Sequence, residues 1–556
     1  MSFQTIRNAS FASGRLLLPG GAALLATTLI ASSVLGWTQY GGAQDDEATP
    51  PYLAEAAEPD AAPDTATAQY PPEDADEPAP PEGPAGLDDP VALYDHLRQL
   101  RQEEHDYATA RALAEQYLTT HPDRAWSRHL VEFEYAMTWY DDDPATAAPL
   151  LAAVAAGHRA LDPAIEPFLL DDALAYAADS YRRSGDPERA IRTYDTFLET
   201  YPASDHRPSA LLGLATLHAE QGEQDPALLR LDQLIREFPE SDYAPQAQVQ
   251  IGQIHLASGD YAGAINTFER VPQRWPDSPQ VPAALRHANR AMAQLDDAEW
   301  VASRSAESAG RHVEVIEATL RRLLTDYPAS PSTPAALLDT IEYYQQAYWW
   351  MLGDNDAVRR RIITLAEQVR TLYPDTDESW RARLELADAL VGPDPARAGA
   401  LLDEAIQSAL RDNKPDRYVA ALFHKGNFCV GTGQPAAARA AFEDVLRSTD
   451  SSRVAANTKL CLAHNYAREG NLTAAIKLFD ELDSADQPED IRGVAVLGKA
   501  HELYAARERE AALAVLDDFL RRFPDSRSAP DALHTRALWS RPQVLIVPDR
   551  DPRSAR

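Results

Sequence analysis

The sequence predicts an all-α solenoid of about eleven helical hairpins, preceded by an N-terminal apolar helix and a disordered linker. Two regularities support this prediction. Three glycines fall 37 residues apart, and each is followed 16 residues later by an aromatic residue and a proline. These positions are Gly185, Gly222 and Gly259, with Tyr201-Pro202, Phe238-Pro239 and Trp275-Pro276. A fixed period of this length indicates one supersecondary unit repeated along the chain.

Residues 1–43 are expected to be a targeting segment that lies outside the repeats. Arg7 and Arg15 precede an uncharged apolar run from Leu16 to Gly36. The run has the ~20 residues that a helix needs to cross a bilayer, whereas Gly41 and the small residues near it suit a cleavage site. The sequence leaves open a cleaved signal peptide or an anchor in the inner membrane. Because arginines before the run stay in the cytoplasm, either alternative places the rest of the chain in the periplasm or cell envelope.

Residues 44–86 are expected to be an acidic, Pro/Ala-rich disordered linker. They contain no Lys and no Arg. Such a composition buries too little apolar surface to offset the entropy of ordering the chain. The linker would therefore act as a solvated, self-repelling spacer.

The repeats occupy residues 87–300 and 413–539 as the N-terminal and C-terminal parts of the solenoid, with irregular repeats at 301–412. In the regular units a Gly-Asp or Gly-Asn pair is expected to end one helix with a left-handed cap and to start the next. The proline ends the second helix, and a serine two residues later can cap the following one. The turns inside the hairpins are expected near residues 105, 142, 185, 222, 259, 311, 357, 393, 433, 470 and 507.

Residues 540–556 are expected to form a C-terminal tail. Its apolar run, Val544 to Val547, follows the last apolar helix and a proline. The run either caps the end of the array, as solenoids require for solubility, or adds a strand to the sheet of a partner.

The side chains inside the units repeat as well. A small residue lies before several turns with an aromatic three positions later, as in Ala178 and Tyr181, and an alanine lies after the turn, with a large apolar residue four positions further on in most units. A small residue where two helices cross lets their backbones approach, and the large residue on the same face fills the gap. The residues assigned to the repeat core are Tyr181, Ala190, Tyr194, Gly252, Ala264, Phe268, Ala438, Phe442, Ala475 and Phe479.

This pattern resembles the tetratricopeptide repeat over roughly residues 90 to 540. The 37-residue period with its aromatic-Pro-x-Ser turn is similar to the repeats of bacterial envelope proteins, namely the outer-membrane assembly lipoproteins and the periplasmic partner of the Tol–Pal system. The resemblance implies a right-handed solenoid that binds other proteins. The chain departs from the assembly lipoproteins because it lacks their lipid-anchoring cysteine, and its array is much longer.

The acidic charge of the chain makes anionic partners unfavourable. It has 86 acidic and 52 basic residues, for a formal net charge of −34. Nucleic acids and anionic lipids are therefore disfavoured, and cationic or apolar protein segments are favoured. The two cysteines, Cys429 and Cys461, are too few for a disulfide framework or a structural zinc site.

The sequence contains no recognisable catalytic, cofactor-binding or metal-binding motif. His218 and His255 lie one repeat apart, and they occupy a slot that tyrosine fills in other units, so packing is expected of both. We expect no enzymatic activity and no cofactor.

Aromatic residues gather at two places. The richer group is the candidate partner-binding site, for which core packing and a ligand groove both remain open. A smaller group, Phe133, Tyr135, Trp139 and Tyr140, is expected in the core. The candidate partner-binding residues are Tyr343, Tyr344, Tyr348, Trp349 and Trp350.

The sequence thus favours a non-catalytic scaffold or adaptor of the periplasm that mediates protein–protein interactions in envelope assembly or maintenance. The alternative is an accessory protein of peptidoglycan or polysaccharide metabolism or export, because helical superhelices also occur in enzymes of that kind. The expected partners are other envelope proteins or peptides, with no nucleic acid among them. The oligomeric state is left open.

Overall fold

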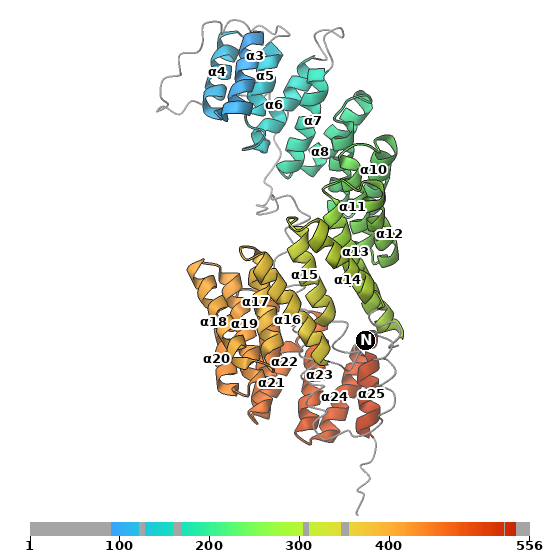
Figure 1. Ribbon diagram of the computed structural model, residues 1–556, viewed down its shortest axis with the longest axis vertical. Helices are drawn as coiled ribbons and strands as arrows, with labels where there is room; N and C mark the ends of the chain where they lie inside the picture. The colour runs from blue at the N-terminus through green and yellow to red at the C-terminus, as the bar shows by residue number, and fades with distance from the viewer. Residues whose placement is uncertain are drawn as a thin grey trace, which may run out of the picture. The chain divides into compact units, whose positions relative to one another are not determined.

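The computed structural model describes residues 90–121, 128–158, 168–303, 311–345, 355–526 and 529–540. Within these ranges the chain forms 23 α-helices, one π-helical segment and no strand, so the all-α prediction is confirmed (Figure 1). None of the described helices has both the length and the apolar character required to cross a membrane. The predicted targeting segment, linker and final apolar run lie outside the described residues.

The described helices belong to two compact units, and the boundary along the chain falls inside α13, between Ala291 and Met292. The first unit holds α3 to α12 and the first part of α13. Its elements are α3 (Pro90–Gln99), η1 (Leu100–Glu104), α4 (Tyr107–Thr120), α5 (Arg128–Met137), α6 (Pro144–His158), α7 (Phe168–Arg183), α8 (Pro187–Thr200), α9 (Arg207–Glu220), α10 (Gln224–Glu237), α11 (Tyr243–Ala257), α12 (Tyr261–Arg274) and α13 (Val281–Ser303).

The second unit holds the end of α13 and the remaining helices. They are α14 (Val313–Asp326), α15 (Ser332–Tyr343), α16 (Asn355–Leu372), α17 (Asp377–Leu390), α18 (Pro395–Arg411), α19 (Pro415–Gly431), α20 (Pro435–Ser448), α21 (Ser452–Arg468), α22 (Leu472–Leu482), α23 (Glu489–Ala505), α24 (Arg509–Arg522) and α25 (Ala529–Ser540).

The described helices form eleven consecutive pairs, from α3 with α4 to α23 with α24, and α25 is left as a single helix (Figure 1). This agrees with the eleven hairpins expected from the sequence. We call the two members of a pair its first and second helix.

The turns inside the pairs follow the expected chemistry. Gly185 has a φ of +77°, and the backbone N–H of Asp186 donates to the carbonyl of Tyr181 at 2.9 Å. The Asp186 side chain then accepts the N–H of Arg189 at 3.0 Å, which caps α8. The predicted left-handed cap is therefore confirmed. Among these turns, two place a residue other than glycine in the left-handed region, His105 and Arg507, and Asn413 does so between α18 and α19, where two pairs adjoin.

The predicted serine cap at the turn between pairs is wrong for α9. Ser204 lies two residues before His206, the N-cap residue of α9, and its Oγ accepts the N–H of His206 at 3.2 Å. Ser241 makes the same bond to Tyr243 at 3.2 Å. The aromatic-Pro-x-Ser sequence thus closes a short turn between pairs.

Small and large residues interlock where first and second helices cross. A Cβ added to Gly252 would lie 2.4 Å from the ring of Phe268, and one added to Gly426 would lie 2.4 Å from the ring of Phe442. Both rings are fully buried. The glycine is required at these crossings because the ring occupies the volume that any side chain would need.

Candidate partner-binding surface

The aromatic residues predicted as a partner-binding site divide into two groups. Tyr343 and Tyr344, at the end of α15, are only 3% and 8% exposed. Tyr348, Trp349 and Trp350 lie outside the described residues. The burial of Tyr343 and Tyr344 favours core packing over an open ligand groove at these two positions, because their rings present little surface to a partner.

Tyr343 belongs to a buried hydrogen-bonded triad. Its hydroxyl donates to Asp296 Oδ2 at 2.7 Å, and Asp296 is fully buried. The same carboxylate accepts the backbone N–H of His312 at 3.1 Å and lies 2.6 Å from His312 Nδ1. The triad joins α13, α14 and α15, so the role of Tyr343 is structural.

Tyr344 belongs to a second network of the same kind. Its hydroxyl donates to Glu317 Oε1 at 2.6 Å, and Arg361 donates to both oxygens of Glu317 at 2.8 and 2.6 Å. Burial alone would raise the pKa of Glu317, but the bonds from Arg361 and Tyr344 bring it below its ordinary value. A carboxylate held in this way links α14, α15 and α16.

The residues predicted for the repeat core lie where helices cross. Gly252 is packed against Phe268, and Tyr181 is half-buried. The remaining eight are at most 3% exposed, and they are Ala190, Tyr194, Ala264, Phe268, Ala438, Phe442, Ala475 and Phe479.

The first helices of the first unit share a polar face. α7 contacts α9, and α9 contacts α11, in addition to the second helix of each pair. Half-exposed side chains bridge them at one-repeat intervals. Gln250 Nε2 donates to Thr216 Oγ1 at 3.0 Å, and His206 Nε2 lies 2.6 Å from Asp172 Oδ1. We call this surface the first-helix face.

One end of this face gathers half-exposed aromatic and acidic side chains. The ring of Tyr176 lies at the centre, with its centroid 5.1 Å from that of Tyr140 and 5.3 Å from that of His206, both edge-on. The Tyr140 hydroxyl donates to Asp179 Oδ2 at 2.6 Å. Tyr94, from α3, packs against the same buried core as Tyr140 and Tyr176. We call this set the tyrosine–aspartate cluster: Tyr94, Tyr140, Asp172, Tyr176, Asp179 and His206.

The electrostatics of the cluster are those of an acidic site. Burial and then the charge of Asp172 raise the pKa of Tyr176, and burial and then Glu134 raise the pKa of Tyr94. The hydrogen bond to Asp172 raises the pKa of His206 against the opposing effect of burial. The carboxylates therefore act on every titratable ring at this end of the face.

The smaller aromatic group is divided between core and surface. Phe133 and Tyr135 are buried as expected, at 5% and 3% exposure. Trp139 and Tyr140 are half-buried instead. The guanidinium of Arg111 lies 3.5 Å from the centre of the Trp139 ring.

The described residues hold few candidates for reactive or metal-binding groups. They contain no group of three His, Cys, Asp or Glu side chains that could hold a metal ion. Cys429 and Cys461 are buried free thiols, and burial raises the pKa of Cys461 to about 12. His218 and His255 each pair with a carboxylate five residues further on, across the turn between the two helices of a pair. The partners are Glu223 and Asp260, respectively. Each histidine thus has a local partner.

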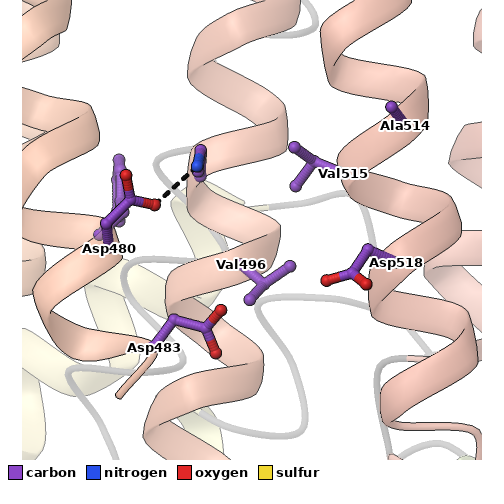
Figure 2. Close-up of a pocket in the computed structure, with 8 residues that line it drawn as sticks. Asp480, Asp483, Val496, Ala514, Val515 and Asp518 are labelled. Carbon is purple, nitrogen blue, oxygen red and sulfur yellow. Dashed lines mark hydrogen bonds and ion pairs between the residues drawn. The ribbon is translucent and has the colours of Figure 1, made fainter.

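A hollow of about 200 Å³ lies between α22, α23 and α24 (Figure 2). Its acidic side chains are already paired. Lys499 donates to Asp480 at 2.6 Å, and Arg522 bridges Asp483 at 2.5 Å and Asp518 at 3.0 Å. With its charges matched internally, the hollow presents no unpaired carboxylate among these three. Its apolar lining consists of Phe479, Val496, Ala514 and Val515.

The tyrosine–aspartate cluster was not predicted from the sequence. Tyr176 lies nine residues before the turn glycine, where the next two repeats have Gly213 and Gln250. A position that changes from tyrosine to glycine to glutamine falls outside the core pattern. Such variability on a fixed scaffold was the available signal, because exposed positions of a repeat are free to specialise.

Comparison with known proteins identifies the repeats. Residues 177–242 and 430–490 match one family model described as a tetratricopeptide repeat, and residues 246–278 match another. These segments are therefore tetratricopeptide repeats, and they include α8 to α10, most of α11, α12 and α20 to α22. No curated protein matches the sequence.

Solved structures of tetratricopeptide repeat proteins are also similar to the chain. One is a repeat protein from Parabacteroides merdae, with 12% identity over 59% of this chain and 98% of that chain and a TM-score of 0.33. Another is the C-terminal part of a repeat protein from Cytophaga hutchinsonii, with 14% identity, 52% and 98% coverage and a TM-score of 0.38. Yeast Tom70 matches with 10% identity, 81% and 95% coverage and a TM-score of 0.34.

Proposed function

We propose that this chain is a non-catalytic scaffold of the cell envelope that binds partner proteins through the first-helix face of its repeats. Tetratricopeptide repeats typically serve as protein–protein interaction scaffolds. The tyrosine–aspartate cluster is the observation that supports this function most directly. Half-exposed aromatic rings beside carboxylates, held on rigid helices, are typical of binding hot spots.

The envelope location is inferred from the sequence before the repeats. The apolar run from Leu16 to Gly36, preceded by arginines, suits export or anchoring at the inner membrane. The acidic linker at 44–86 would then separate the repeats from the membrane. A fusion of residues 1–86 to a reporter active only after export tests this directly. Activity retained after deletion of residues 16–36 would contradict it.

In-cell photocrosslinking tests the scaffold function. A photoreactive amino acid at Gln246, half-exposed on the first helix α11, should capture a stoichiometric protein partner. The matched control is Glu199, exposed on the second helix α8, where we expect little capture. Tandem purification and mass spectrometry would identify the product. Equal capture at both positions, or recovery of glycan fragments alone, would contradict a partner-binding first-helix face.

A further inference from the structure

We propose that the tyrosine–aspartate cluster binds an arginine or lysine side chain from an extended cationic segment of the partner. The inference rests on the proposed function and specifies the chemistry of that partner. It depends on three features of the first unit: two tyrosine rings over which no described arginine or lysine is placed, carboxylates beside them and an acidic surround.

Three aromatic rings in or near the cluster have an arginine guanidinium over them. Arg111 lies 3.5 Å from the Trp139 ring centre, and Arg183 lies 4.7 Å from that of Tyr140. Arg189 lies 5.9 Å from the ring centre of Tyr181. Neighbouring half-exposed rings are thus covered by guanidinium groups of the chain, an arrangement favoured by the ring quadrupole.

Tyr94 and Tyr176 differ from these neighbours. In the described residues no arginine or lysine is placed over either ring. The nearby Arg101 instead pairs with the buried carboxylate of Glu134 at 2.8 Å. Both rings are half-exposed, so a cation from outside can approach them.

Carboxylates lie where they can pair with that cation. Asp172 is 35% exposed, and its charge acts on the Tyr176 ring. Asp171 lies on the same turn of α7 and has no side-chain partner in the described residues. An ammonium or guanidinium over Tyr176 would be within reach of these carboxylates, so cation–π and ionic attraction would add.

The acidic charge of the first unit favours a cationic segment as the ligand of the tyrosine–aspartate cluster. Residues 90–291 contain 31 acidic and 17 basic residues. The chain's own linker, with 12 acidic and no basic residues between 44 and 86, would be repelled. A cationic segment of another protein would be attracted, and it would bring a positive group that can be placed over Tyr94 or Tyr176.

The test measures fluorescence anisotropy of a labelled peptide with four arginines spaced by Gly and Ser, added to the full chain. We expect Asp172→Asn to weaken binding about fivefold and Tyr176→Leu about tenfold. The matched control Glu199→Gln removes the same charge from the exposed surface of α8 and should leave binding within about twofold. A peptide with glutamine in place of arginine should not bind.

His206→Gln separates binding from structure. The amide can keep a hydrogen bond to Asp172 and removes the competing positive charge, so the peptide should bind more tightly. Circular dichroism checks the fold of each variant. The proposal is overturned if Asp172→Asn and Tyr176→Leu change the affinity no more than the control Glu199→Gln does. It is also overturned if the wild type fails to bind the arginine peptide. If the Gln246 crosslink captures a protein through a segment without basic residues, the scaffold function stands and this inference fails.

Discussion

The helices α7 to α12 and the helices α13 to α17 solve the same packing problem with different chemistry. In the first set, a small residue faces a large apolar or aromatic side chain where helices cross, as Gly252 faces Phe268. In the second set, buried or half-buried carboxylates join three helices at a time, as Asp296 and Glu317 do. Apolar interlocking recurs with the repeat, whereas each polar network is specific to its place.

The difference indicates where each region tolerates change. Apolar packing is lost in proportion to the volume removed. A polar network fails when one member leaves a buried group unsatisfied, even if the volume is kept. The two regions should therefore respond oppositely to truncation and to isosteric replacement.

Phe268→Ala should have the largest effect, because it empties a fully buried site in the interlocking region. We expect the α11–α12 region to lose about 3–5 kcal/mol of local stability. Hydrogen exchange with mass spectrometry on the full chain would detect it. Leu229→Ala, at a residue that is 60% exposed, is the control and should change stability by less than about 0.5 kcal/mol. Equal effects would contradict the apolar interlocking.

Asp296→Asn keeps the shape of the side chain and should still destabilise the other region. The amide cannot satisfy Tyr343, the His312 N–H and the His312 ring as the carboxylate does. We expect a loss of about 2–3 kcal/mol, seen as faster exchange in α13 to α15. Tyr343→Phe removes one bond and should cost about 1 kcal/mol. No change for Asp296→Asn would show that the buried triad does not stabilise this region.

Lowering the pH should change the stability of the last repeats and that of the first unit in opposite directions. Burial and then the charge of His464 lower the pKa of His501 to about 4. The unfolded chain binds this proton near pH 6.5, so stability at α23 is present above that value and falls as pH drops toward 4. We expect a loss of about 2 kcal/mol after allowing for partial exposure. His206 has a raised pKa and should favour folding on acidification instead.

Thermal unfolding between pH 7 and 4.5, with exchange measured at α9 and α23, would resolve the two histidines. In His501→Phe the acid sensitivity of α23 should disappear, since no proton can bind there. The new ring should keep the edge contact with Trp539, whose ring lies 5.1 Å from that of His501. An unchanged pH profile in this variant would show that another group governs the acid response.

The sequence predicted the pairs and turns because their residues recur. Gly185 and Phe268 each occupy a slot whose chemistry is fixed by backbone conformation or by volume, so the period makes them visible. Tyr343 and Asp296 are 47 residues apart and belong to no period, so their contact could not be anticipated. Tyr176 escaped notice for a related reason. An exposed slot has no fixed chemistry, and only the structure shows that α5 and α9 bring Tyr140 and His206 to it.

Arg507→Gly should have the smallest effect, and its sign is informative. Arg507 has a φ of +68° at the turn where Gly185 and its equivalents stand. A left-handed residue with a Cβ costs about 1–2 kcal/mol, while glycine costs about 0.5–1 kcal/mol through the greater freedom of the unfolded chain. We therefore expect a net stabilisation of about 0.5 kcal/mol, measured by exchange in α23 and α24. Gly222→Ala reverses the change at a regular turn with a φ of +77° and should destabilise by a similar amount. If both variants destabilise, then Arg507 stabilises its turn through its side chain, and the turns are not interchangeable between the two units.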